Sequence, residues 1–344
     1  MKIAIDKNSI SAVKPDNEYI YLFNNEPLEE LLNTKLHCIH YKSCDFVDIN
    51  LTNYEINCIK KAKITDKDYD ILPEKKDYKF AIIVPNCNND HGNYNGKTFL
   101  KNCIESILNQ TYKNFELIIV DDMSTDTSVN TIINYMKDKR VHLIKNKRKR
   151  YNGGSRNVGI EYAFDYVDFD YFCFLDSDDW WKHNQVLENI NNHLYNHELM
   201  TLGCEGIGVN YKHYNKATCY QDLYSLNSHV WCTAWSKVIR KDKIVYFCED
   251  TLMEDRVWTY RLADNINFEN VINLNELVYC WNRTNTTNSV SIVRSDYWNA
   301  CAYCHIGHQK QLITQLKHKE MIPIIEQRIK ECIKKVNNNI YEQH

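Results

Sequence analysis

The chain has 344 residues, 44% of them hydrophobic and 25% charged, with a net charge of −3 and a pI near 6.5. These values suit a folded protein of one large domain or two smaller ones, and they argue against a general binder of nucleic acids or anionic membranes. No apolar run approaches the roughly 20 residues of a membrane span, and the first residues lack the features of a signal peptide. We therefore expect a cytoplasmic protein whose 14 cysteines are reduced thiols.

The first part of the chain, residues 1–77, alternates short strand-like pieces such as residues 19–23 with a helical piece at residues 28–36. This pattern predicts a small α/β appendage, and nothing in it indicates a role.

The next part alternates strand and helix signals. Continuous apolar runs predict strands, and apolar residues at three- and four-residue spacing predict helices between them. The predicted strands lie at residues 80–84, 117–120, 141–144 and 171–175, and the predicted helices lie at residues 99–108, 129–136 and around 160–163. Such alternation is typical of an α/β fold with a doubly wound, mostly parallel sheet.

Polar residues directly follow three of these strands. The first strand runs into Pro85 and residues 86–88, the second into Asp121 and Asp122, and the last into residues 176–179. The carboxyl ends of parallel strands meet at the edge where such sheets bind ligands. We therefore expect these residues to form one site.

Residues 176–179 (Asp-Ser-Asp-Asp) place three carboxylates within four residues. Like charges this close repel one another unless a cation lies between them, and carboxylate oxygens suit Mg²⁺ or Mn²⁺. The alternative is an acidic N-cap of a helix that Trp180 and Trp181 would open.

Glycine is scarce, with nine in the chain, yet three of them lie in residues 152–159. We predict a loop at this point that turns tightly or approaches a ligand and leads into the following helix. Arg156 stands beside the glycines and favours contact with an anion such as phosphate; the alternative is a plain loop.

A series of ordered motifs over about residues 78–290 resembles the family 2 glycosyltransferases. The motifs lie at residues 84–88, 103–112, 114–126, 152–159, 176–179, 253–255 and 279–283. Several motifs in order are far more specific than any one of them. The resemblance implies a GT-A fold, with a nucleotide-sugar half at residues 78–180 and an acceptor half at residues 181–290.

The resemblance also implies roles for particular residues. Asp255 would be the general base, and Asp176 and Asp178 would hold Mn²⁺ or Mg²⁺, with Asp178 as the direct ligand. Asp121 would accept a hydrogen bond from the nucleotide base, usually uracil. The full set of expected donor-binding residues is Pro85, Asn88, Asp121, Asp122, Gly153, Arg156 and Asp176.

The acceptor would lie near the second half of the motifs. Glu254 would position its neighbours there, and Trp235 would pack on the acceptor or, alternatively, in the core together with Trp231. The acceptor class stays open between a glycan, a modified nucleic acid and another hydroxyl compound.

The chemistry of sugar transfer explains why these residue types are needed. A divalent cation neutralises the charge that builds on the departing diphosphate, and a carboxylate removes the proton of the attacking hydroxyl. Base and leaving group on opposite sides of the sugar imply one in-line displacement with inversion. A nucleotidyltransferase and a catalytically inactive binding module are the competing hypotheses.

Three positions depart from the family pattern. Cys87 stands where an aromatic residue often packs on the base, Met123 replaces a usual glycine, and residues 89–95 resemble an insertion. These departures leave the identity of the donor base open.

Two further segments have alternative interpretations. Residues 301–308 match a haem attachment pattern and carry Cys and His residues on one helical face, but a buried helix face is the preferred interpretation. The basic run at residues 145–150 predicts a solvated turn or a phosphate contact. Residues 291–344 predict helices, with a stripe of Ile325, Ile329, Ile333 and Val336 that packs on its own domain or covers a partner or membrane.

Overall fold

The structure is a computed structural model that describes residues 2–6, 19–23, 45–47, 77–147, 151–213, 233–251, 254–284 and 295–337. The chain divides into two compact units, residues 1–75 and 76–344. In the first unit, β1 (Lys2–Asp6) pairs in parallel with β2 (Tyr19–Phe23) and antiparallel with β3 (Asp45–Val47). The strand predicted at residues 19–23 is confirmed, and the helix predicted at residues 28–36 lies outside the described residues.

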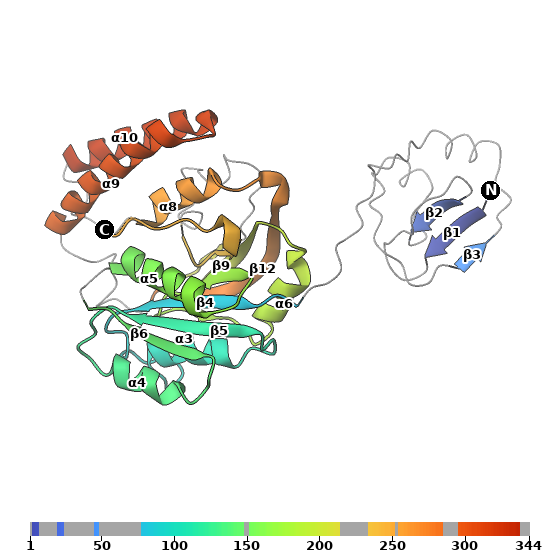
Figure 1. The fold of residues 1–344 in the computed structure, drawn as a ribbon, viewed down its shortest axis with the longest axis horizontal. Helices are drawn as coiled ribbons and strands as arrows, with labels where there is room; N and C mark the ends of the chain where they lie inside the picture. Colours follow the sequence, from blue (N-terminus) through green and yellow to red (C-terminus); the bar gives the residue numbers. More distant parts are fainter. Residues whose placement is uncertain are drawn as a thin grey trace. The chain divides into compact units, whose positions relative to one another are not determined.

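The second unit is built on one mixed sheet (Figure 1). In spatial order its strands are β6 (Val141–Lys145), β5 (Phe115–Asp121), β4 (Phe80–Asn86), β7 (Tyr171–Phe174), β11 (Lys237–Arg240), β9 (Leu199–Ile207), β12 (Val271–Asn282) and β8 (Trp180–Trp181), and β10 (Lys212–His213) pairs with β9. The first four of these are parallel neighbours. Among the eight described strands in this order, β11 and β8 are antiparallel to the other six, which confirms a mostly parallel sheet.

Helices cover both faces of the sheet (Figure 1). Alternate residues of β4 point to opposite faces, so Ala81 and Ile83 join one core and Phe80 and Ile82 the other. The first core is covered by α5 (Tyr151–Tyr166), α8 (Glu254–Ala263), α9 (Ser295–Gln315) and α10 (Ile322–Asn337). The second is covered by α3 (Phe99–Leu108), α4 (Ser128–Tyr135) and α6 (Val186–Leu194). Every residue of β4 is buried, as its continuous apolar run predicts.

Short 3₁₀ turns complete the described elements of this unit. They are η2 (Lys241–Lys243), η3 (Phe268–Asn270) and η5 (Lys319–Met321).

The alternative in which Trp180 and Trp181 open a helix after the acidic residues is wrong. Trp180 and Trp181 form β8, which pairs antiparallel with Cys280 and Tyr279 of β12, and both tryptophans are buried. Pairing with β12 outweighs the local signal for a helix cap, because it buries more of the apolar surface of the two indole rings.

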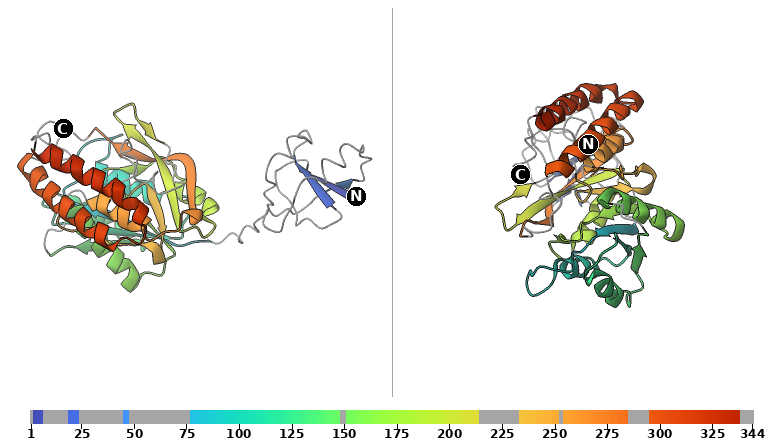
Figure 2. Two further views of the ribbon diagram at one scale, coloured as in Figure 1. Left: turned by 90° about the horizontal axis from the view of Figure 1, so that it is seen from above. Right: turned by 90° about the vertical axis from the view of Figure 1, so that its left-hand side faces the viewer.

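The C-terminal helices α9 and α10 lie side by side (Figure 2). Ile325, Ile329 and Val336 are buried, so the stripe packs on its own domain. Ile333 is 38% exposed, and Cys332 takes its place on the buried face. No helix among the described residues is long and apolar enough to cross a membrane.

Candidate active site

Three neighbouring strands end at one edge of the sheet. The register of β4 and β5 pairs Asn86 with Asp121, and that of β4 and β7 pairs Ile83 with Phe174. Asp176 follows two residues after Phe174 and therefore lies at the same edge. The structure thus brings the polar strand ends together.

Asp121 is bonded to other residues of the chain. Its side chain accepts hydrogen bonds from Asn86 Nδ2 at 3.1 Å and from the backbone N–H of Ser124 at 3.2 Å, and the residue is 1% exposed. Asp121 therefore lies inside the protein and is not among the residues that line the cavity at this edge.

Asp122 caps the helix that carries Arg156. Its carboxylate accepts from Asn146 Nδ2 at 3.0 Å and from the backbone N–H of Tyr151 at 2.9 Å. A carboxylate at a helix N-terminus satisfies a free N–H and interacts favourably with the helix dipole. Asp122 therefore holds α5 against the sheet edge.

Asn88 joins the loop after β4 to the loop after β5. Its Oδ1 accepts from the backbone N–H groups of Thr125 at 2.7 Å and Asp126 at 3.2 Å, and its φ is 55°. Met123 has φ of 63°, in the left-handed region that a glycine adopts at lower cost. Pro85, by contrast, lines the cavity itself.

An open, polar cavity lies at this edge of the sheet. It is lined by Pro85, Cys87, Asn89, Asn152, Asp176, Ser177, Asp178, Asp179, Trp281, Asn282 and Arg283. The site prediction lacks Asn89, Asn152 and the residues from the end of β12. Residues 281–283 belong to the last motif and Asn152 to the glycine motif, so motif membership was the available signal.

The three carboxylates of residues 176–179 have different surroundings. Asp179 is 2% exposed and accepts from the Tyr279 hydroxyl at 2.6 Å and from the Asn282 N–H at 2.7 Å. Burial, together with the charges of Asp178 and Asp176, raises the pKa of Asp179 well above its usual range. Asp176 and Asp178 are partly exposed and line the cavity. All three residues line the cavity, but only Asp176 and Asp178 are partly exposed, whereas buried Asp179 ties the loop to β12.

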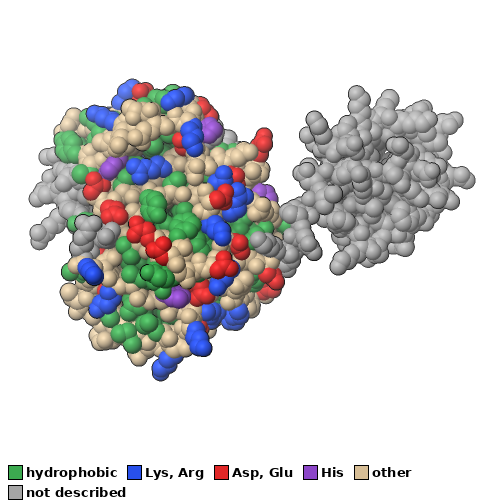
Figure 3. All heavy atoms as spheres, in the orientation of Figure 1, with side chains coloured by type: hydrophobic (Ala, Val, Ile, Leu, Met, Phe, Trp, Pro, Cys, Tyr) green, Lys and Arg blue, Asp and Glu red, His purple; other side chains and the backbone are tan. Residues whose placement is uncertain are grey.

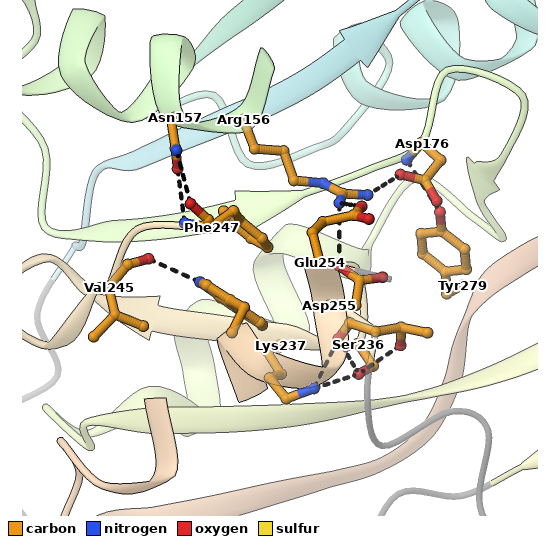
Figure 4. A network of polar contacts seen from close by, with 12 residues as sticks. Arg156, Asn157, Asp176, Ser236, Lys237, Val245, Phe247, Glu254, Asp255 and Tyr279 are labelled. Carbon is orange, nitrogen blue, oxygen red and sulfur yellow. Dashed lines mark hydrogen bonds and ion pairs between the residues drawn. The ribbon is translucent and has the colours of Figure 1, made fainter. Parts of the chain in front are cut away.

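Arg156 joins the acidic loop to the start of α8. Figure 4 shows its guanidinium between Asp176 on one side and Glu254 and Asp255 on the other. Nη2 donates to Asp176 at 2.7 Å, and Nη1 donates to Glu254 at 2.8 Å and to Asp255 at 3.1 Å. Burial raises the pKa of both acids of α8; the charge of Asp255 raises that of Glu254 further, and Arg156 opposes the rise.

The predicted glycine loop is wrong, because α5 begins at the motif and runs through it. A Cβ at Gly153 would lie 2.2 Å from the carbonyl oxygen of Cys248 and 3.1 Å from the Glu254 Cβ, and one at Gly159 would lie 2.6 Å from Ile83 Cγ2. These two glycines therefore allow α5 to pack closely on its neighbours, which is the physical reason for their place in the chain.

Trp235 packs inside the protein. It is 4% exposed, and its ring stacks on Tyr279 with centroids 4.2 Å apart and planes 11° apart. This arrangement matches the core alternative for Trp235, whereas Trp231 lies outside the described residues. Lys237 is also buried, and its Nζ donates to the carbonyl oxygen of Thr233 at 2.7 Å.

Residues 301–308 lie on α9. In the described part of the chain, no group of three or more His, Cys, Asp or Glu side chains is placed to hold a metal ion. His305 is buried, Cys304 is exposed, and His308 Nε2 lies 2.6 Å from Asp250 Oδ1. The buried helix face is thus found for His305 and not for Cys304.

Charges of both signs are interspersed on the face of the second unit that Figure 3 shows. Of the basic run at residues 145–150, the last three residues lie outside the described residues.

The sheet, its flanking helices and the acidic cavity define a GT-A-type glycosyltransferase. The chain belongs to the family described as glycosyl transferase family 2, whose model matches residues 81–262, just over half of the chain. The family resemblance and the predicted fold class are therefore confirmed.

Curated relatives match over part of their length. An uncharacterized glycosyltransferase of Haemophilus influenzae is 42% identical over 111 residues, which is 32% of this chain and 43% of the relative. The UDP-Glc:alpha-D-GlcNAc-diphosphoundecaprenol beta-1,3-glucosyltransferase WfaP of Escherichia coli is 42% identical over 98 residues, 28% of this chain and 37% of the relative. The chain thus spans less than half the length of these relatives.

Solved structures share the fold at low identity. S. aureus TarS 1-349 superposes with a TM-score of 0.53 at 18% identity, over 72% of this chain and 69% of that chain. Its complex with UDP-GlcNAc gives a TM-score of 0.52 at 19% identity, over 67% of this chain and 66% of that chain.

Proposed function

We propose that this chain is a metal-dependent, inverting glycosyltransferase that moves a sugar from a UDP-sugar to an acceptor hydroxyl. Residues 78–290 form the catalytic domain in this proposal, with the donor half at residues 78–180 and the acceptor half at residues 181–290.

One observation supports the proposal above the others. A single guanidinium, that of Arg156, bonds Asp176 at 2.7 Å and Asp255 at 3.1 Å. The expected cation ligand and the expected base, 79 positions apart in the sequence, therefore lie at one end of one side chain. A reaction that needs a cation on the leaving group and a base on the nucleophile requires this proximity.

The residues of the acidic loop fit a hard divalent cation. Asp176 and Asp178 offer carboxylate oxygens to the cavity, and their charges raise the pKa of the neighbouring Asp179. Mg²⁺ is usually held by one or two carboxylates together with substrate phosphates, so no third protein ligand is required. Bound there, Mn²⁺ or Mg²⁺ would act as a Lewis acid on the leaving diphosphate.

The remaining steps belong to side chains of the cavity and of α8. Asp255 accepts the proton of the acceptor hydroxyl. As it does so, the hydroxyl oxygen attacks the anomeric carbon, and the bond from that carbon to the diphosphate breaks. Arg283 is the one Lys or Arg among the described residues that line the cavity; its guanidinium lies 4.5 Å from the Trp281 ring, and we assign it to the diphosphate.

Support for the donor comes from the comparisons. The Escherichia coli relatives are named for UDP-Glc, and the S. aureus neighbour is solved with UDP-GlcNAc. The same relatives are named for an acceptor that is a sugar on a lipid diphosphate, so we place a glycan hydroxyl first among the acceptor classes.

A panel of nucleotide sugars with Mn²⁺ tests the proposal by the product that is released. The enzyme should release UDP from one UDP-sugar, whereas a nucleotidyltransferase would release pyrophosphate. In Asp255→Asn we expect loss of turnover by about 10²-fold or more with donor binding retained. If the chain is an inactive binding module, neither the unsubstituted chain nor Asp255→Asn would release a diphosphate.

A further inference from the structure

Arg156 is bonded by three carboxylates that come from separate parts of the chain (Figure 4). Asp176 follows β7, while Glu254 and Asp255 open α8. Arg156 is 1% exposed, and it forms no bidentate ion pair, because its two Nη atoms donate to different carboxylates. Its Nε has no hydrogen-bond partner within the described residues. The guanidinium therefore acts as a shared bridge between the acidic loop and the base.

Asp176 has two possible partners of positive charge. Its Oδ1 accepts from Arg156 Nη2 at 2.7 Å. A divalent cation on Asp176 would compete for the same carboxylate and would be repelled by the buried guanidinium beside it. Repulsion is strong here, because Arg156 is shielded from solvent and screened little by salt.

We propose that Arg156 is a positioning residue that suppresses cation binding in the donor-free cavity, so that the cation binds firmly only together with a nucleoside diphosphate. Because Asp176 must be a cation ligand for this role, the role rests on the proposed function. The diphosphate supplies the oxygen ligands and negative charge that outweigh the repulsion by Arg156. Glu254 and Asp255 continue to hold the guanidinium when Asp176 turns to the cation.

The two sides of the bridge predict opposite effects of substitution. Arg156→Met removes the competing charge, and we expect the affinity for Mn²⁺ without nucleotide to rise by about tenfold or more. Asp255→Asn removes a carboxylate that neutralises Arg156, and we expect that affinity to fall. A purely structural role for Arg156 predicts weaker binding in both variants.

Mn²⁺ binding can be measured without turnover, by the electron paramagnetic resonance signal of free Mn²⁺ in titrations with and without UDP. In the unsubstituted chain UDP should strengthen Mn²⁺ binding, because coupling between two ligands is reciprocal. The ratio of the Mn²⁺ affinities with and without UDP should be smaller in Arg156→Met. Circular dichroism and thermal unfolding establish that each variant is folded.

Two further variants keep the test decisive. Arg240→Met removes an equal charge at the other end of β7, where Arg240 is in register with Tyr171, and should leave Mn²⁺ binding unchanged. Arg156→Lys keeps the charge and should stay within about threefold of the unsubstituted chain. If Arg156→Met does not fold, the comparison of Arg156→Lys with Asp255→Asn carries the test.

The outcomes separate two kinds of failure. If the unsubstituted chain binds Mn²⁺ with UDP but folded Arg156→Met binds free Mn²⁺ no more tightly, the role of Arg156 is wrong and the proposed function stands. If the unsubstituted chain binds no Mn²⁺ with either UDP or GDP, both are wrong.

Discussion

Tyr279 donates its hydroxyl hydrogen to Asp179 at 2.6 Å, and the same oxygen accepts the backbone N–H of Asp176 at 3.2 Å. One phenol on β12 thus holds two positions of the acidic loop. The ring of Trp235 stacks on the ring of Tyr279 and limits the orientation of the phenol. The late motif of the sequence therefore supports the cavity from behind.

Tyr279→Phe removes this hydroxyl without changing the size of the ring. Asp179 then loses one hydrogen-bond donor inside the protein, and we expect the free energy of unfolding to fall by about 1–3 kcal/mol. Because the loop is less well held, we expect a higher KM for the donor. Urea unfolding and the kinetics of diphosphate release measure the two effects.

Tyr112→Phe is the matched control, because the Tyr112 hydroxyl donates at 2.6 Å to the carbonyl oxygen of Tyr78, among the core residues under α3. This variant should lose stability and keep the donor KM. An unchanged donor KM in Tyr279→Phe would contradict the supporting role of Tyr279.

Asp178→Asn removes a carboxylate that faces the cavity. Since Asp178 also raises the pKa of buried Asp179, its removal relieves repulsion, and we expect an unchanged or slightly higher melting temperature. Turnover should fall by about 10²-fold or more, as expected when one electrostatic group at the leaving charge is lost.

Asp138→Asn changes a carboxylate that pairs with Arg140 at 2.6 Å, outside the cavity, and should leave turnover unchanged. Equal turnover in both variants, measured by diphosphate release, would show that Asp178 has no part in the reaction.

Much of the fold could be predicted from the sequence, because buried parallel strands are continuous apolar runs. The strand expected at residues 171–175 is β7, and the helix expected at residues 99–108 is α3. Both signals are local, so a window of the sequence contains the information.

The sequence does not predict the role of the glycine motif, because the residues that require these glycines are far away in the chain. Gly153 is required by Cys248 and Glu254, which approach α5 from about 100 positions further along the chain. Likewise, nothing near Asp179 shows that Tyr279 would bury it, so the three acids could not be distinguished by sequence alone.

Gly153→Ala tests the close approach of α5. The new methyl group would meet the Cys248 carbonyl at 2.2 Å, and backbone cannot move aside cheaply. We expect a loss of stability of about 1–3 kcal/mol from overpacking, and reduced turnover because Arg156 is carried on the displaced helix.

Gly307→Ala is the natural comparison, because a Cβ at this position on α9 meets nothing within 4 Å. Alanine in a helix is favoured over glycine by about 1 kcal/mol, so this variant should be more stable and equally active. Two variants with the same stability in urea would contradict the packing found at Gly153.

We expect the buried imidazole of His305 to make the stability of the protein depend on pH. It is fully buried, neither ring nitrogen has a hydrogen-bond partner in the described part of the chain, and burial, with smaller contributions from Arg256 and His308, lowers its pKa to about 3. The unfolded chain, with an ordinary histidine pKa, binds a proton below about pH 6.5 that the folded chain does not. This contribution to stability is therefore complete above about pH 6.5 and is lost as the pH falls toward 3.

His305→Gln removes the titration and keeps a polar side chain. Relative to this variant, we expect the unsubstituted chain to lose about 2 kcal/mol of unfolding free energy between pH 8 and pH 5, since each proton contributes about 1.4 kcal/mol per pH unit. Urea unfolding at a series of pH values measures the difference, and subtraction of the two curves removes the carboxylates common to both proteins. Parallel curves over this range would show that His305 is protonated equally in the folded and unfolded chains, and that the imidazole is solvated.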